Sequence, residues 1–144
     1  MHLMGIFLPL IIILGYYSPA QGKVLTQCEA AQELVKGGVS RSFISNFVCL
    51  MKSESGLDTR KKTGPKTMSS YCYGVFQINS AKWCEQSRKG GVCNKKCDEF
   101  ITDDIQDDVA CAKMIHSQEG FNHWPGWVKD CKNKALPDLS GCKY

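Results

Sequence analysis

Cysteine is the residue type with the most evident chemistry in this chain of 144 residues, which contains nine of them. Cysteines in such numbers form disulfides in oxidising compartments, whereas close pairs in cytosolic proteins more often bind metal. Cys93 and Cys97 have the spacing of zinc ligands, but no second close pair accompanies them. We therefore predict a disulfide framework with at least one unpaired thiol, because nine is odd. Spacing alone leaves the pairing open, since eight cysteines allow 105 connectivities.

The amino-terminal segment indicates which compartment the chain reaches. Leu3 to Leu14 is an apolar run, and Ala20-Gln21-Gly22 places small residues before a cleavage point. This pattern predicts a secretory signal peptide over residues 1–22 and one domain over residues 23–144. A retained anchor is the alternative, but the run is too short to span a membrane, and no stop-transfer charges follow it. We expect a secreted, extracellular protein whose net charge of +4 suits anionic partners or an ordinary soluble surface equally well.

Two helices are predicted in the first part of that domain. Thr26 and Glu29 fit a capping box and Gly37-Gly38 a stop, which predicts a helix over 27–36. Apolar residues recur at helical spacing from Phe43 to Met51 behind Ser42, and Ser55-Gly56 ends that second helix. Glu54 therefore lies in the last turn of a largely buried helix.

The middle of the chain has a different pattern. Residues 57–70 are rich in Lys, Thr, Ser, Gly and Pro and suit a loop, whereas residues 71–79 alternate large apolar residues with smaller or polar ones. Such alternation predicts a strand over 71–79, with Cys72 on it.

Two further helices are predicted near the carboxyl end. Thr102 can cap a helix over 103–116, whose first turns carry Asp103, Asp104, Asp107 and Asp108. A short fourth helix is expected near 126–134. The chain thus reads as α+β, with a mostly helical lobe, a small lobe of strand and loop, and a ligand cleft between them.

Several local motifs together resemble one family. They are Cys49-Leu50-Met51-Lys52-Ser53-Glu54-Ser55, Tyr73-Gly74-Val75-Phe76-Gln77-Ile78-Asn79-Ser80, Trp83-Cys84, Cys111-Ala112-Lys113, and Trp124 with Trp127 before Cys131. In these motifs, and from Lys23 onward, the chain resembles the C-type lysozyme and α-lactalbumin family. The resemblance implies a lysozyme-like fold with a small antiparallel sheet and four disulfides: Cys28 with Cys142, Cys49 with Cys131, Cys84 with Cys97, and Cys93 with Cys111. Cys72 is left out.

The family's reaction hydrolyses the β-1,4 bond between N-acetylmuramic acid and N-acetylglucosamine, with one carboxylic acid on each side of the bond. By resemblance Glu54 is the proton donor. The carbonyl end of its helix and the apolar ring of Trp124, which the family places beside this acid, both disfavour its charged form. Without the resemblance, Glu54 reads as an exposed glutamate at a helix end.

The second carboxylate belongs immediately before Tyr73-Gly74, where this chain has Cys72. Asp58 and Glu85, the nearest acids, match no catalytic position, and Met68 and Tyr71 replace polar residues that orient the missing acid. Three states of Cys72 stay open: a buried inert thiol, a disulfide to another molecule, and a nucleophile. An ordinary thiol is mostly neutral at pH 7, and no His or Lys is adjacent in sequence to activate it. The resemblance therefore implies impaired hydrolysis.

Substrate-binding positions match the family better. By resemblance they are Gln77, Asn79, Trp83 and Trp124, although Lys82 replaces an aromatic residue that many relatives have and the two tryptophans could be core residues. Some members of the family also bind calcium at this part of the chain. Asp104, Asp107 and Asp108 match part of that site, but Thr102 and Glu99 depart from it and helix capping explains the acids as well. We expect no cofactor, with calcium as a weak alternative.

Three functions follow from these observations. The first is a secreted glycosidase, with peptidoglycan or a chitin-like oligosaccharide at the bacterial surface as its partner. The second is a non-catalytic glycan-binding protein with the same cleft. The third is a lactalbumin-like modifier of a glycosyltransferase. We expect a monomer that binds no nucleic acid and does not span a membrane.

Overall fold

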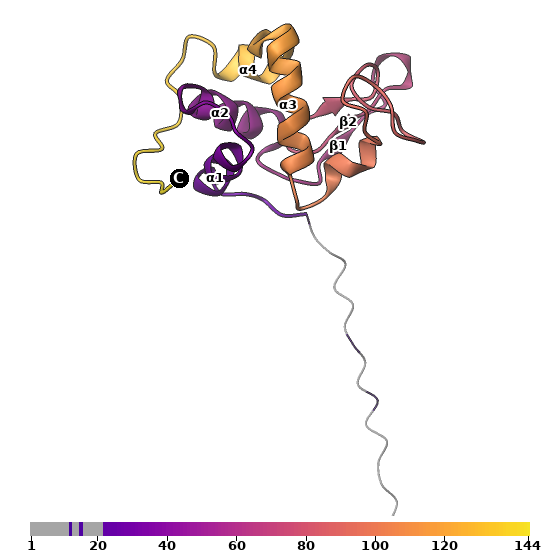
Figure 1. The fold of residues 1–144 in the computed structure, drawn as a ribbon, viewed down its shortest axis with the longest axis horizontal. Helices are drawn as coiled ribbons and strands as arrows, with labels where there is room; N and C mark the ends of the chain where they lie inside the picture. The colour runs from indigo at the N-terminus through magenta and orange to yellow at the C-terminus, as the bar shows by residue number, and fades with distance from the viewer. Residues whose placement is uncertain (1–11, 13–14, 16–21) are drawn as a thin grey trace, which may run out of the picture.

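The chain folds into a group of helices and a small sheet that lie side by side (Figure 1). The computed structural model describes residues 12, 15 and 22–144, so the predicted signal peptide lies outside the described residues except at three positions. The helices are α1 (Gln27–Lys36), α2 (Ile44–Ser55), α3 (Gln106–Glu119) and α4 (Pro125–Asp130). The strands β1 (Lys62–Thr63), β2 (Cys72–Tyr73) and β3 (Ile78–Asn79) form an antiparallel sheet in that order. The predicted α+β class is confirmed. In the part of the chain that the structure describes, no helix has the length and apolar character needed to cross a bilayer.

Helices α1 and α2 form close to where the sequence predicts them. The backbone N–H of Glu29 donates to Thr26 Oγ1 at 3.1 Å, but the Glu29 carboxylate pairs with Lys23 instead of completing the capping box. A 3₁₀ turn over Arg41–Phe43 precedes α2, and Phe43, not Ser42, is its amino-terminal cap. Gly56, with φ of 63°, ends α2 in the left-handed conformation that glycine adopts without strain.

The prediction of one strand over 71–79 is wrong, because the chain reverses in the middle of that segment. Residues 74–77 form a turn between β2 and β3, with φ of 74° at Gly74 and 50° at Gln77. Strand β1 lies inside the predicted loop and pairs with β2, so Thr63, Cys72 and Asn79 lie opposite one another across the sheet.

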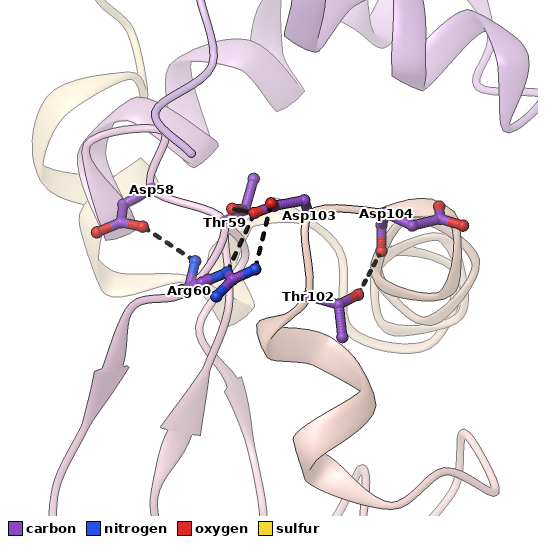
Figure 2. A network of polar contacts seen from close by, with 6 residues as sticks. All are labelled: Asp58, Thr59, Arg60, Thr102, Asp103 and Asp104. Atoms are coloured by element: carbon purple, nitrogen blue, oxygen red, sulfur yellow. Dashed lines mark hydrogen bonds and ion pairs between the residues drawn. The ribbon is translucent and has the colours of Figure 1, made fainter. Parts of the chain in front are cut away.

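The third helix begins at Gln106, three residues later than predicted, and Thr102 does not cap it. The Thr102 hydroxyl donates to the Asp104 carbonyl oxygen, and Asp103 is held by Thr59 and Arg60 (Figure 2). These contacts hold the segment in a non-helical path, after a 3₁₀ helix over Cys97–Ile101. Helix α4 is also shorter than the predicted range of 126–134: it ends at Asp130, before the disulfide-bonded Cys131.

Four disulfides cross-link the chain, and a single core joins the helices to the sheet. The disulfides are Cys28–Cys142, Cys49–Cys131, Cys84–Cys97 and Cys93–Cys111, the pairs that the resemblance implies. Cys93 and Cys97, with their zinc-like spacing, thus belong to two different disulfides. The largest fully buried side chains come from both parts of the fold; they include Trp83, Trp124, Tyr73, Phe47 and Phe76.

Candidate active site

A cleft of about 580 Å³ separates the sheet from the segment that connects α3 to α4. Its lining residues are Glu54, Lys61, Thr63, Lys66, Cys72, Gln77, Asn79, His123, Trp124 and Pro125. The structure therefore brings five of the six predicted site residues to one cleft: Glu54, Cys72, Gln77, Asn79 and Trp124. Trp83 does not line it.

Glu54 reaches the cleft from the last turn of α2. The backbone N–H of Gly126, in α4, donates to Glu54 Oε1 at 2.8 Å. The Glu54 backbone carbonyl accepts from Lys61 Nζ at 2.9 Å. The described residues give Oε2 no hydrogen bond. The side chain is thus held through one oxygen, and the other has no partner among the described residues.

Cys72 occupies the sheet side of the cleft, on the central strand. It is half-buried and is the one unpaired cysteine within the described ranges. Its sulfur accepts a hydrogen bond from Asn79 Nδ2 at 3.3 Å, and the same nitrogen donates to Ser70 Oγ at 3.3 Å. Among the described residues that line the cleft, Glu54 is the one acid. The cleft thus holds a carboxyl group on one side and a thiol on the other.

The polar groups of Gln77 and Trp124 are already used within the protein. The Gln77 amide donates to the carbonyl oxygens of Lys61 and Gly74 and accepts from the Thr63 hydroxyl. The Trp124 indole donates to the Phe76 carbonyl oxygen at 3.0 Å. Both side chains therefore hold the turn between β2 and β3 against its neighbours.

Trp83 lies under a polar contact that joins the two sides of the fold. Its ring is 1% exposed, with Lys82 Nζ 4.6 Å from its ring centroid and the His123 ring at 5.6 Å. Lys82 Nζ pairs with Glu119 at 2.7 Å, and His123 pairs with the other oxygen of the same carboxylate. These hydrogen bonds, first from Lys82 and then from His123, lower the pKa of Glu119. The role of Trp83 in binding sugar stays a prediction.

Sequence reasoning missed Lys61, Thr63, Lys66, His123 and Pro125 as cleft residues. Lys61, Thr63 and Lys66 lie in the segment predicted to be a loop. Lys62 and Thr63 form β1 there, which brings this segment to the cleft. A short strand inside a polar segment has no hydrophobic alternation to reveal it. The excess of lysine over acid in residues 57–70 was the available signal.

The three aspartates considered for calcium lie in one part of the fold but do not form a group placed to hold a metal ion among the described residues. The Asp104 carbonyl oxygen, the ligand that the resemblance implies, accepts from the Thr102 hydroxyl at 2.9 Å, and Asp107 pairs with Lys95 at 3.1 Å. Asp108 is fully buried, and neither of its oxygens has a hydrogen-bond partner among the described residues. The described ranges contain no group of three or more His, Cys, Asp or Glu side chains placed to hold a metal ion. These residues do not fit calcium, and no chemistry is assigned to it.

A second cavity, of about 650 Å³, lies between α2, α4 and the carboxyl-terminal segment. Its two acids already have hydrogen-bond partners: Asp130 accepts from Ser53, which also lines this cavity, at 2.5 Å, and Asp138 accepts from the backbone N–H of Ser140. The cleft that holds Glu54 is therefore the better candidate for chemistry.

The fold and the cleft define a class of protein: a two-part α+β domain with four disulfides and a carboxylic acid placed where helices meet a small sheet. The chain belongs to the C-type lysozyme/alpha-lactalbumin family, whose family model matches residues 23–142. The lysozymes of this family are glycoside hydrolases that bind peptidoglycan-type glycans.

Named relatives and solved structures agree with this assignment. The chain is 37% identical over 133 residues to lysozyme c-1 of Anopheles gambiae, covering 92% of this chain and 94% of that one. It is 40% identical over 124 residues to a lysozyme of Bombyx mori, covering 85% and 89%. The crystal structure of a stabilised canine milk lysozyme superposes with a TM-score of 0.77 at 35% identity, covering 85% of this chain and all of that one.

Proposed function

We propose that the chain is a secreted lysozyme-like glycoside hydrolase of reduced activity. Its substrate is the β-1,4 bond between N-acetylmuramic acid and N-acetylglucosamine in bacterial peptidoglycan. The observation that carries the proposal is that Glu54 and Cys72 line one cleft together with Asn79 and Trp124. Family membership supports the reaction type, and the thiol in place of an acid supports the reduced rate.

Glu54 is the proton donor in this proposal. In a glycosidase of this type one carboxylic acid protonates the leaving oxygen, and a second carboxylate attacks or stabilises the positive sugar carbon. The hydrogen bond from Gly126 orients Glu54 Oε1 and leaves Oε2 for the proton. Asn79, half-buried beside the thiol, and the buried Trp124 line the cleft that receives the sugar.

Cys72 replaces the second carboxylate without supplying its fixed negative charge. Removing one preorganised electrostatic stabiliser typically lowers the rate by about 10² to 10³. Proton donation and substrate positioning survive that loss. Slow hydrolysis is therefore the expected outcome.

The second candidate function is a non-catalytic glycan-binding protein. It is favoured by the lack of any other acid among the described cleft residues, while the cleft itself is retained. In either case we propose an extracellular monomer whose mature domain is 23–144 after removal of signal peptide 1–22. Its partner is then peptidoglycan or a chitin-like oligosaccharide at a bacterial surface.

Two substitutions test the proposal directly. Glu54→Gln removes the proton donor and should abolish fragment release from purified peptidoglycan, whereas Cys72→Asp should raise release at least about tenfold by restoring a fixed charge. Glu85→Gln, at a glutamate that pairs with Arg88 outside the cleft, is the control and should match wild type. If wild type releases no more fragments than Glu54→Gln while both bind chitin oligomers, the hydrolase proposal fails and the binding function stands.

A further inference from the structure

We infer that the cleft selects glycans whose sugars carry negative charge, in preference to neutral polymers of N-acetylglucosamine. The inference rests on the proposed function in one respect: the cleft must bind a glycan. The observation behind it is the charge of the cleft lining, which has two lysines and one acid where two-carboxylate chemistry needs two acids.

Two lysines on the sheet side of the cleft have no compensating acid. Within the described ranges, neither Lys61 nor Lys66 forms an ion pair with a carboxylate. Lys61 Nζ donates to the backbone carbonyl of Glu54, which is a neutral acceptor, and Lys66 is exposed. With Glu54 as the one lining acid, the lysines leave the cleft with a net positive charge.

The strand geometry directs these charges inward. Lys62 extends over the rings of Tyr71 and Tyr73, with Nζ 5.0 and 5.1 Å from their centroids, and does not line the cleft. Its neighbours Lys61 and Thr63 do, as expected where successive side chains of a strand point to opposite faces. Lys61 and Lys66 therefore place positive charge on the cleft wall itself.

The thiol at position 72 is part of the same arrangement. Thr63 lies opposite Cys72 in the register of β1 and β2, and both lysines line the same cleft as the position that a carboxylate would occupy. A carboxylate there would attract both ammonium groups and repel an anionic sugar. The thiol does neither, so the charges of Lys61 and Lys66 can act on an anion of the ligand while Lys61 Nζ keeps its hydrogen bond to the Glu54 carbonyl oxygen.

The size of the preference follows from measured ion pairs. A partly exposed pair contributes about 0.2 to 1 kcal/mol, which converts to a factor of about 1.4 to 5 in affinity. Two lysines should therefore favour a charged oligosaccharide by about 2- to 25-fold at low salt. Because these groups are open to solvent, the preference should shrink as ionic strength rises.

Binding of three hexasaccharides tests the inference. One alternates glucuronate with N-acetylglucosamine, one carries sulfate on its amino sugar, and one is the neutral N-acetylglucosamine hexamer. Dissociation constants are measured by titration calorimetry at low and at physiological salt, for wild type, Lys66→Gln and Cys72→Asp. Lys89→Gln, at an exposed lysine outside the cleft, is the matched control.

For wild type we expect a lower dissociation constant for one or both charged hexasaccharides than for the neutral one. Lys66→Gln should reduce that preference by about 1.4- to 5-fold, weakening charged binding more than neutral binding, and Cys72→Asp should reduce it as well. Equal or tighter binding of the neutral hexamer, or equal effects of Lys66→Gln and Lys89→Gln, overturns the inference while the proposed function stands. If no hexasaccharide and no peptidoglycan is bound, the proposed function itself fails.

Discussion

Asp108 is a buried acid that the cleft does not use. It lies in the first turn of α3, is 0% exposed, and has no hydrogen-bond partner among the described residues. Burial raises its pKa well above the ordinary value of 3.8, and the nearby charges of Asp107 and Asp104 act in the same direction. The folded protein therefore holds Asp108 protonated at pH values where the unfolded chain ionises it.

This difference makes the stability of the fold depend on pH. Because the folded state binds the extra proton, the free energy of unfolding should fall as pH rises above about 4, until Asp108 ionises in the folded state as well. The change is at most about 1.4 kcal/mol per pH unit. Asp108→Asn should remove this slope and leave the variant more stable than wild type at neutral pH, as measured by urea unfolding between pH 4 and 8. An equal slope in both proteins would show that Asp108 does not titrate in this range, and the exposed Asp98→Asn serves as the control.

At the scale of elements, the turn between β2 and β3 determines where Cys72 and Asn79 lie. Gly74 begins that turn with φ of 74°, and a Cβ atom there would lie 1.9 Å from the Phe100 carbonyl oxygen. The turn therefore requires glycine for two reasons, backbone conformation and contact with the 3₁₀ helix over Cys97–Ile101.

Gly74→Ala should therefore destabilise the fold by about 2 to 4 kcal/mol, because it adds overpacking to left-handed strain. Gly56→Ala is the matched variant: its φ is 63°, but no atom lies within 4 Å of an added Cβ. It should lose only the strain contribution, about 1 kcal/mol. Urea unfolding of both variants measures the two losses, and equal losses would contradict the close contact at Gly74.

The elements that the sequence predicts well are those whose signals are local. The extent of α1 and the end of α2 follow from Thr26, Gly37 and Gly56, which act on the residues beside them. The start of α3 cannot be predicted from its neighbouring residues, because Asp103 is held by Thr59 and Arg60 from a distant part of the chain. A period-two pattern likewise predicts extended backbone over 71–79 but cannot reveal a reversal at Gly74.

The candidate site shows the same division. Motif resemblance placed Glu54, Cys72, Asn79 and Trp124, and the structure puts all four in one cleft. The lysines that set its charge were missed, because their position depends on strand pairing that a polar segment does not indicate.

At the scale of the whole molecule, the disulfides differ in how much chain they enclose. Cys28–Cys142 spans 114 residues, whereas Cys93–Cys111 spans 18. In the chain-entropy account, the first should stabilise by about 5 kcal/mol and the second by about 3 kcal/mol.

Paired alanine substitution tests this order. The Cys28→Ala/Cys142→Ala variant should lose about 2 kcal/mol more unfolding free energy than Cys93→Ala/Cys111→Ala, since the longer loop restricts the unfolded chain more. Thermal and urea unfolding of the two variants measure the difference. A larger loss from the shorter loop would mean that local packing outweighs loop length.

The unpaired thiol also affects how the protein matures. Eight cysteines allow 105 pairings, and a ninth multiplies these by the number of ways to choose the one that stays out. In the folded chain that choice is made by the sheet, since Cys72 lies on the central strand with neighbours on both sides. Pairing of β2 with β1 and β3 therefore also restricts which thiols can pair, because it holds Cys72 on the central strand of the sheet while the other eight cysteines are in disulfides.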